Sequence, residues 1–287
     1  MNTLSIRIDN EDVATLSHYE GEFALTYNSA WSAAGGYPIS PHLPFAEISR
    51  GAAVNNFFSN LLPEGEMLSG LSLQHQVSKF DVFGLLKKVG RDCAGAMVIA
   101  ESEQTEEQDP DGYTLTSDEE LNQQIIDSRR ANVSLMYWGR KPRMSLAGVQ
   151  NKLGVYLDTD ESVYLPLQSQ PTSHILKIGD PRYPGQAANE YFCMQLAEAV
   201  GLSVPATLFR KLPEPVLLVH RYDREWTSDA HTIRRRHQID ACQALNLPPN
   251  LKYEMPDYEY APTGATLADI VGLARLCDTP SSAQFAL

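Results

Sequence analysis

The order of the predicted elements between residues 145 and 222 constrains the fold of this chain more than any other feature. Alternating apolar side chains predict a β-hairpin with strands at 153–157 and 163–165. A third strand, a helix and a fourth strand are predicted at 173–178, 188–200 and 216–220. A doubly wound sheet would alternate single strands with helices. The order of hairpin, strand, helix and strand therefore indicates a small nucleotide-binding lobe.

Residues 1–100 predict a separate α+β module. Alternating apolar side chains at its beginning are typical of a β-meander. Helical spacing follows at 54–62 and at 80–89, and Gly90 is expected to end the second helix in the left-handed conformation. A last strand is expected at 97–100.

An acidic segment, ESEQTEEQDPDG at 101–112, lies between the two modules and carries six acids and no aromatic residue. This composition is typical of a solvated linker. We expect an N-terminal module at 1–105, an acidic linker with a connecting helix at 106–143, and a second module at 144–287. The predicted fold class is α+β.

The composition excludes several classes of protein. A net charge of -13 argues against a surface that binds nucleic acid directly, because such surfaces cluster Lys and Arg. No apolar stretch approaches the roughly 18 residues needed to span a membrane, and the N-terminus does not resemble a signal peptide. The four cysteines have no paired spacing, so they are expected to be reduced core thiols of a cytoplasmic protein.

The loop SLAGVQNK at 145–152 precedes the predicted hairpin and is a candidate phosphate-binding loop. Polyphosphate needs inward-turned backbone N–H groups and a close backbone approach, which Gly148 permits. The segment is not a Walker loop, which needs GxxxxGK[ST] ahead of a helix. One glycine leaves an ordinary hairpin turn open as the alternative.

Lys177 and Glu190 are candidates for an ion pair. Lys177 lies inside an apolar strand, and Glu190 lies near the start of the following helix. A second apolar stripe, which includes Phe192 and Leu196, indicates that this helix is covered on much of its circumference. An acid on such a helix is expected to meet a cation, because a buried charge is costly unless it is paired. In protein kinases such a pair orients the lysine toward phosphates; two unrelated surface charges are the alternative.

The segment HRYDR at 220–224 follows the apolar fourth strand. A strand in this place could offer backbone groups to an adenine edge, and Tyr222 could cover the purine face. Tyr222 could equally be an aromatic residue of a domain interface, and the charged residues beside it a local salt network of little energetic weight. The basic run RRRH at 234–237 is expected to be a solvated turn rather than a phosphate site.

These segments, together with blocks along almost the whole chain, resemble the HipA family of bacterial serine/threonine kinase toxins from type II toxin–antitoxin pairs. The blocks are FFSNLLPEG (57–65), FDVFGLLKKVGRDCAGAM (80–97), SLAGVQNKLGV (145–155), SHILK (173–177), NEYFC (189–193), GLSVP (201–205), HRYDR (220–224), HQIDACQALNLPP (237–249) and LKYE (251–254). Their number and order make a chance resemblance improbable.

The resemblance implies a HipA-like N-terminal module packed on a protein-kinase-like body that binds ATP and Mg²⁺. The implied ATP-binding residues are Ala147, Gly148, Val149, Gln150, Lys152, Lys177, Glu190, His220, Arg221 and Tyr222. Ser145, which opens the loop, is the implied autophosphorylation site, and its phosphate would expel the loop by charge repulsion. His220 stands where the best-known members have glutamate, a change that a backbone contact would tolerate.

The resemblance also implies partners. The family is neutralised by a HipB-like helix-turn-helix antitoxin, and it phosphorylates aminoacyl-tRNA synthetases, chiefly the glutamyl enzyme. No direct nucleic-acid or membrane contact of this chain is expected.

The catalytic aspartate of the family lies in a D-x-H-x-x-N-type segment, and its metal-binding aspartate lies later; both are expected after Leu287. We therefore assign no catalytic and no metal-binding residue in this chain, expect the larger lobe to be truncated, and expect no turnover by the chain alone. One hypothesis is the N-terminal portion of an ATP-dependent kinase toxin. The other is a non-catalytic module that binds an antitoxin or is phosphorylated in trans on Ser145. A small-molecule kinase is disfavoured by the N-terminal blocks.

Overall fold

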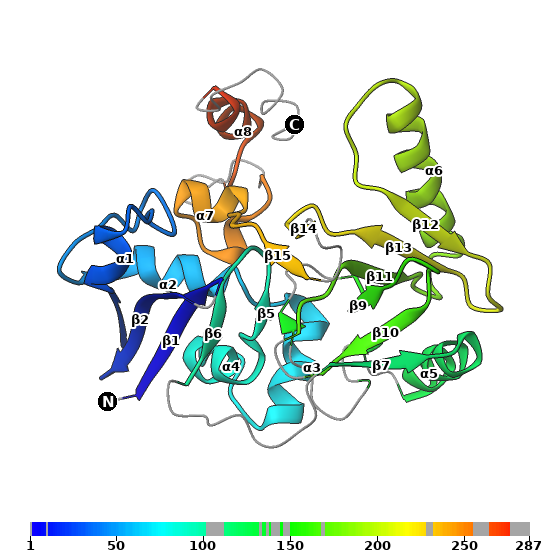
Figure 1. Cartoon of the computed structure of the whole chain (residues 1–287), viewed down its shortest axis with the longest axis horizontal. Coiled ribbons are helices and arrows are strands. Elements are labelled where there is room, and N and C mark those ends of the chain that lie inside the picture. Colours follow the sequence, from blue (N-terminus) through cyan, green and yellow to red (C-terminus); the bar gives the residue numbers. More distant parts are fainter. Residues whose placement is uncertain are drawn as a thin grey trace.

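The structure is a computed structural model of the 287-residue chain. It describes residues 2–9, 11–101, 112–131, 134–135, 138, 144–145 (backbone only), 150–167, 170–227, 232–254 and 264–275. Two modules, each with its own sheet, lie side by side, and the segment around α7 lies against the first module (Figure 1).

The N-terminal module is built on a five-stranded antiparallel sheet of order β4-β3-β2-β1-β6. Its strands are β1 (Asn2–Ile8), β2 (Glu11–Tyr19), β3 (Glu22–Tyr27), β4 (Ser49–Arg50) and β6 (Val98–Ala100). Glu20 and Gly21 both have positive φ, as a two-residue hairpin turn requires. The predicted β-meander is confirmed.

Helices complete this module. They are α1 (Ser29–Ala33), α2 (Ala52–Ser59), α3 (Gly65–His75) and α4 (Val82–Val89). Phe57 and Phe58 of α2 and Leu85 and Leu86 of α4 share one buried core with the strands. The expected left-handed conformation of Gly90 is wrong, because its φ is -73°. Glycine is needed there for space instead: a Cβ would lie 2.6 Å from the Leu86 carbonyl oxygen.

The second module is built on a six-stranded antiparallel sheet of order β12-β13-β11-β9-β10-β7. Its strands are β7 (Tyr113–Thr116), β9 (Lys152–Leu157), β10 (Val163–Pro166), β11 (His174–Ile178), β12 (Thr207–Arg210) and β13 (Val216–His220). The predicted hairpin, third strand and fourth strand are β9–β10, β11 and β13. The predicted α+β class is confirmed.

Two helices lie on opposite faces of this sheet. Leu121 and Ile125 of α5 (Asp118–Ala131) share a core with strand residues such as Leu176. Ala187 of α6 (Gln186–Ala199) packs on Leu217 of β13 on the other face. Within the segment expected to be a linker, β7 and α5 therefore belong to the layers of the second module.

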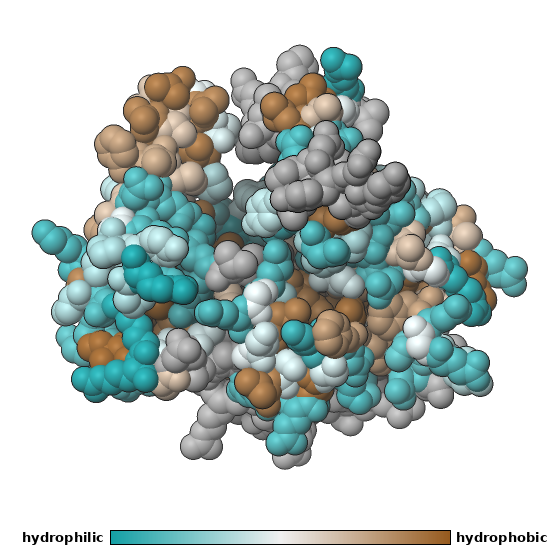
Figure 2. Space-filling model, turned by 180° about the vertical axis from the view of Figure 1, so that it is seen from behind, coloured by the Kyte–Doolittle hydropathy of each residue, from teal (hydrophilic) through white to brown (hydrophobic). Residues whose placement is uncertain are grey.

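The outer side of α6 is apolar and open. Phe192 is 63 % exposed, Leu196 53 % and Val200 68 %, and they contribute to the apolar lobe at the upper left of Figure 2. The expectation that this helix is covered on much of its circumference is wrong. Cys193 is also exposed, so the expected burial of the thiols does not hold for it, whereas Cys93 and Cys242 are buried.

The remaining elements connect the modules. β5 (Asp92–Cys93) pairs in parallel with β8 (Met144–Ser145), and β14 (Arg224–Trp226) pairs with β15 (Ile233–Arg235). The chain continues into α7 (Ala241–Leu245), the 3₁₀ helix η2 (Pro249–Leu251) and α8 (Leu267–Ala274). None of the described helices combines the length and the apolar content that crossing a bilayer requires.

The region around α7 is tied to α2 of the first module by side-chain hydrogen bonds. The amide of Asn56 donates to the carbonyl oxygen of Asn246 at 2.9 Å, and that of Asn60 to Leu247 at 2.8 Å. Gln243 donates to the carbonyl oxygen of Phe57 at 2.9 Å. These contacts fix the region around α7 on the N-terminal module.

Candidate nucleotide-binding site

The candidate site lies on the face of the second sheet that α6 covers only in part. Side chains alternate along a strand, so Lys177 of β11 points to the face opposite the buried Leu176. In the register of the sheet, Lys177 is paired with Lys152 of β9, and Ile175 with Val219 of β13. Two lysines therefore lie next to an apolar patch on one face.

The expected ion pair between strand and helix is present. The ammonium group of Lys177 on β11 contacts the Glu190 carboxylate on α6, and the two side chains are 21 % and 28 % exposed. The pair fixes the lysine at the edge of the face that α6 leaves open. The alternative of two unrelated surface charges is excluded, whereas the role of the pair in binding a nucleotide stays a prediction.

Lys152 experiences an unusual electrostatic environment. Burial, followed by the positive charges of Lys177 and Lys252, lowers its pKa to about 8. Like charges on directly opposite strand positions are destabilising. Two positive charges therefore lie side by side on this face, and a polyphosphate carries the opposite charge.

Most of the predicted phosphate loop cannot be compared with the structure. Ala147, Gly148 and Val149 lie outside the described residues. The backbone of Ser145 forms β8 and pairs with Cys93 of the N-terminal module. Gln150 is half-buried, and its amide nitrogen has no hydrogen-bond partner within the described ranges.

The residues at 220–222, which are predicted to contact the adenine, differ from one another in their surroundings. The ring of His220 faces away from the lysines, toward His174, with 5.2 Å between ring centroids. The backbone N–H of His220 donates to Ala206 at 2.8 Å, and that of Arg221 donates to Ser173 at 2.9 Å. These two donors are occupied in this structure, so an adenine contact would have to use other groups of the segment. Tyr222 is 65 % exposed.

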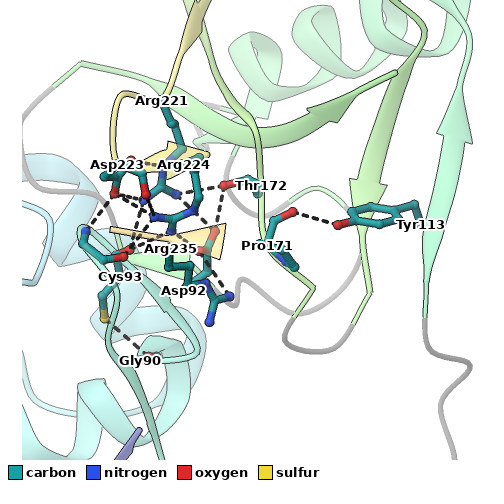
Figure 3. Close-up of polar contacts among 11 residues, drawn as sticks. Gly90, Asp92, Cys93, Tyr113, Pro171, Thr172, Arg221, Asp223, Arg224 and Arg235 are labelled. Atoms are coloured by element: carbon teal, nitrogen blue, oxygen red, sulfur yellow. Dashed lines mark hydrogen bonds and ion pairs between the residues drawn. The ribbon is translucent and has the colours of Figure 1, made fainter. Parts of the chain in front are cut away.

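Arg221 belongs to a buried group of charges that we call the junction cluster. It consists of Asp92, Thr172, Arg221, Asp223, Arg224 and Arg235 (Figure 3). Arg221 donates to Asp223 at 2.7 Å and contacts Asp92 at 3.3 Å, and its side chain is only 1 % exposed. A nucleotide contact from Arg221 is therefore restricted to its backbone.

The junction cluster joins the two modules. Asp92 lies on β5 of the first module, and it contacts Arg224 of β14 at 2.7 Å. Burial alone would raise the pKa of Asp92, but the guanidinium groups of Arg221, Arg224 and Arg235 outweigh it and hold the pKa at about 2. The interpretation of this segment as a local salt network of little weight is wrong, because the network is buried and spans the junction.

The basic run is not a turn. Ile233–Arg235 forms β15, and Arg235 extends into the junction cluster with 11 % of its side chain exposed. Arg234 and Arg236 are solvated, as expected, and pair with Asp9 and Glu225. The prediction is correct for these two arginines and wrong for Arg235.

Sequence reasoning missed one further pair beside the lysines. Lys252, directly after η2, contacts Glu64 of the N-terminal module at 2.7 Å between Nζ and Oε1. Both residues lie in blocks that carry the family resemblance, but no charge pattern links residues so far apart in the chain. A separate hollow of about 580 Å³ lies near Asp118 and Arg210, away from these lysines.

Comparison with known proteins accounts for both modules. Residues 4–100 match the family model of the HipA N-terminal domain, and residues 144–285 match that of the HipA-like C-terminal domain. The chain is 36 % identical over 239 residues to the kinase candidate Y4mE of Sinorhizobium fredii, which covers 81 % of this chain and 56 % of that protein.

A second relative is the serine/threonine-protein kinase toxin HipA of Shewanella oneidensis. It is 30 % identical over 275 residues, which cover 91 % of this chain and 60 % of the relative. The fold also matches a solved complex of HipA, HipB and operator DNA from Shewanella oneidensis, with a TM-score of 0.82 and 28 % identity over 98 % of this chain and 66 % of that one. The chain thus spans less than two thirds of the length of these proteins.

The two family domains match this chain in sequence, and the fold matches that of a solved HipA. The chain belongs to the HipA family of serine/threonine kinase toxins.

Proposed function

We propose that this chain binds ATP on the open face of the second sheet and is the nucleotide-binding part of a HipA-type serine/threonine protein kinase. The observation that carries the proposal is the ion pair of Lys177 with Glu190, beside Lys152 on the neighbouring strand. Protein kinases use such a lysine–glutamate pair to hold the α- and β-phosphates. The HipA-like fold supports the same placement.

The chemistry of the face fits a nucleotide in two parts. Lys152 and Lys177 supply positive charge for the phosphates. Ile175 and Val219 lie directly across from each other on the same face and give the purine ring an apolar surface. Tyr222 is exposed and would contribute its ring at the edge of the site.

Mg²⁺ is the metal that the family implies. Among the residues that the structure describes, no group of three or more His, Cys, Asp or Glu side chains is placed to hold a metal ion. The proposal for ATP therefore rests on the lysines and the apolar patch.

The remaining parts of the proposal follow from the family. We propose a protein substrate of the aminoacyl-tRNA synthetase class, neutralisation by a HipB-like antitoxin, autophosphorylation of Ser145 and a cytoplasmic location. The solved relative in complex with HipB and operator DNA supports an antitoxin partner. The net charge of -13 supports a DNA role through that partner rather than by direct contact.

Calorimetric titration of the purified chain with ATP and with AMP, both with magnesium, tests the proposal. ATP should bind clearly more tightly than AMP, because the lysines contact the phosphates that AMP lacks. Equal affinity for the two nucleotides, or no heat with ATP at millimolar concentration, would contradict it. Labelled ATP separately tests the expectation that the 287-residue polypeptide does not transfer phosphate: label on the wild type but not on Ser145→Ala would show autophosphorylation.

The affinity for ATP should fall as the pH rises from about 7.5 to about 9. The pKa of Lys152 is lowered to about 8, so the free protein loses this charge above that pH. A bound phosphate favours the protonated form, so binding takes up a proton at high pH and weakens by at most about tenfold per pH unit. Titrations at the two pH values measure this loss.

Lys152→Arg is the matched control for the pH dependence, because arginine stays charged throughout this range. Its affinity for ATP should change less with pH than that of the wild type. The same slope in both proteins would show that Lys152 is not the group that titrates.

A further inference from the structure

Glu64 and Lys252 form a contact between the modules close to the candidate site. Glu64 precedes α3 in the N-terminal module, and Lys252 follows η2. Nζ and Oε1 lie 2.7 Å apart, and the side chains are 19 % and 30 % exposed for Glu64 and Lys252. The ion pair is thus open to solvent in part, and a ligand could displace one partner.

This pair lies within electrostatic range of the phosphate-binding lysines. The charges that act on Lys152 are those of Lys177, Lys252, Glu64 and Glu190. Two lysine–glutamate pairs, one from α6 and β11 and one from the module junction, therefore border the same lysine.

The pair is not required to hold the chain on the N-terminal module. Hydrogen bonds from Asn56, Asn60 and Gln243 already fasten this region to α2. A partly exposed ion pair contributes little to stability by itself. Asp240, the other acid that acts on Lys252, uses its carboxylate to cap α7 by accepting the Gln243 N–H at 2.7 Å. Glu64 is thus the acid that holds Lys252.

We propose that Lys252 is a third phosphate-binding lysine of the nucleotide site, and that Glu64 of the N-terminal module competes with the nucleotide for it. The inference rests on the proposed binding of ATP. When the nucleotide binds, Lys252 exchanges the carboxylate for a phosphate oxygen, and no covalent bond changes. The contact between Glu64 and Lys252 and the binding of the nucleotide are then coupled. The nucleotide weakens the contact by the same free energy by which the contact weakens nucleotide binding.

Titrations of Glu64→Gln and Lys252→Ala with ATP and AMP test this inference. Lys252→Ala should lose about tenfold in affinity for ATP, as expected for one charged hydrogen bond, and little for AMP. Glu64→Gln removes the competing charge at nearly constant shape, so its affinity for ATP should rise by about threefold without a matching rise for AMP. Lys87→Ala, from an exposed pair with Glu101, is the control and should bind like the wild type.

The two variants predict opposite signs, which a purely structural contact does not produce. If the pair only fastened the modules, Glu64→Gln would leave the affinity for ATP unchanged or lower it, and the inference would be overturned. If the wild type binds ATP and Lys177→Ala binds it more weakly, but Glu64→Gln and Lys252→Ala bind it like the wild type, this inference alone is overturned. A wild type that does not bind ATP would overturn the proposed function as well.

Discussion

Replacing Asp92 by alanine should destabilise the folded protein by about 3–5 kcal/mol, the cost of removing one partner from a buried ion pair. Asp92 has 6 % of its side chain exposed, and its carboxylate accepts hydrogen bonds from Thr172 at 2.8 Å and from Arg224 at 2.7 Å. Without it, the guanidinium groups of Arg221 and Arg224, each 1 % exposed, stay buried with too little negative charge. Denaturant unfolding of both proteins measures the difference.

Asp9→Ala is the matched control. Asp9 also pairs with an arginine, Arg234, at 3.2 Å, but its side chain is 41 % exposed and that of Arg234 is 66 % exposed. An exposed pair is typically worth about 0–1 kcal/mol, so this variant should unfold almost like the wild type. Similar losses in the two variants would show that burial at the junction cluster does not carry the energy assigned to it.

The pH dependence of unfolding gives a second readout for Asp92. Its pKa is about 2 in the folded protein, below the usual 3.8. A carboxyl group with a depressed pKa stabilises the folded state fully above its unfolded pKa and loses that contribution as the pH falls through the folded pKa. As the pH falls from 3.8 to about 2, the wild type should lose stability more steeply than Asp92→Ala, because the variant lacks the titrating group.

The strands of the fold were predictable, because alternation of apolar residues is a local signal. Alternation identified β9, β10 and the meander of the N-terminal module, and short apolar runs identified β11 and β13. Among the elements that were missed, α3 and β12 show why a local pattern can fail. α3 follows Pro63 and contains Gly65 and Gly70, which weaken its helical pattern. The four residues of β12 are all half-buried and show no alternation.

The site was predictable only where its parts are close in the sequence. Lys177 and Glu190 lie on a strand and on the helix that directly follows it, so their pairing could be anticipated from the spacing. The contact of Asp92 with Arg224 and that of Glu64 with Lys252 join residues on different modules. Single charges separated by such lengths of chain carry no periodic signal, and only the fold brings them together.

Lys177→Ala should lower the affinity for ATP by about 10- to 100-fold. The substitution removes the cation that Glu190 holds beside Lys152. It also leaves the carboxylate of Glu190, which is 28 % exposed, without the ion pair, where its charge repels phosphate. Lys177 is paired directly with Lys152 in the sheet, whereas Lys252 lies at the module junction, so the loss should exceed that expected for Lys252→Ala.

Calorimetric titration of the wild type, Lys177→Ala and the control Lys87→Ala with ATP tests the central claim most directly. Lys87 also pairs with a glutamate, Glu101, but on the exposed surface of the N-terminal module. We predict that the wild type and Lys87→Ala bind ATP with the same affinity and that Lys177→Ala binds at least about tenfold more weakly while it remains folded. Equal binding of ATP by all three proteins would contradict the assignment of this face as the nucleotide site.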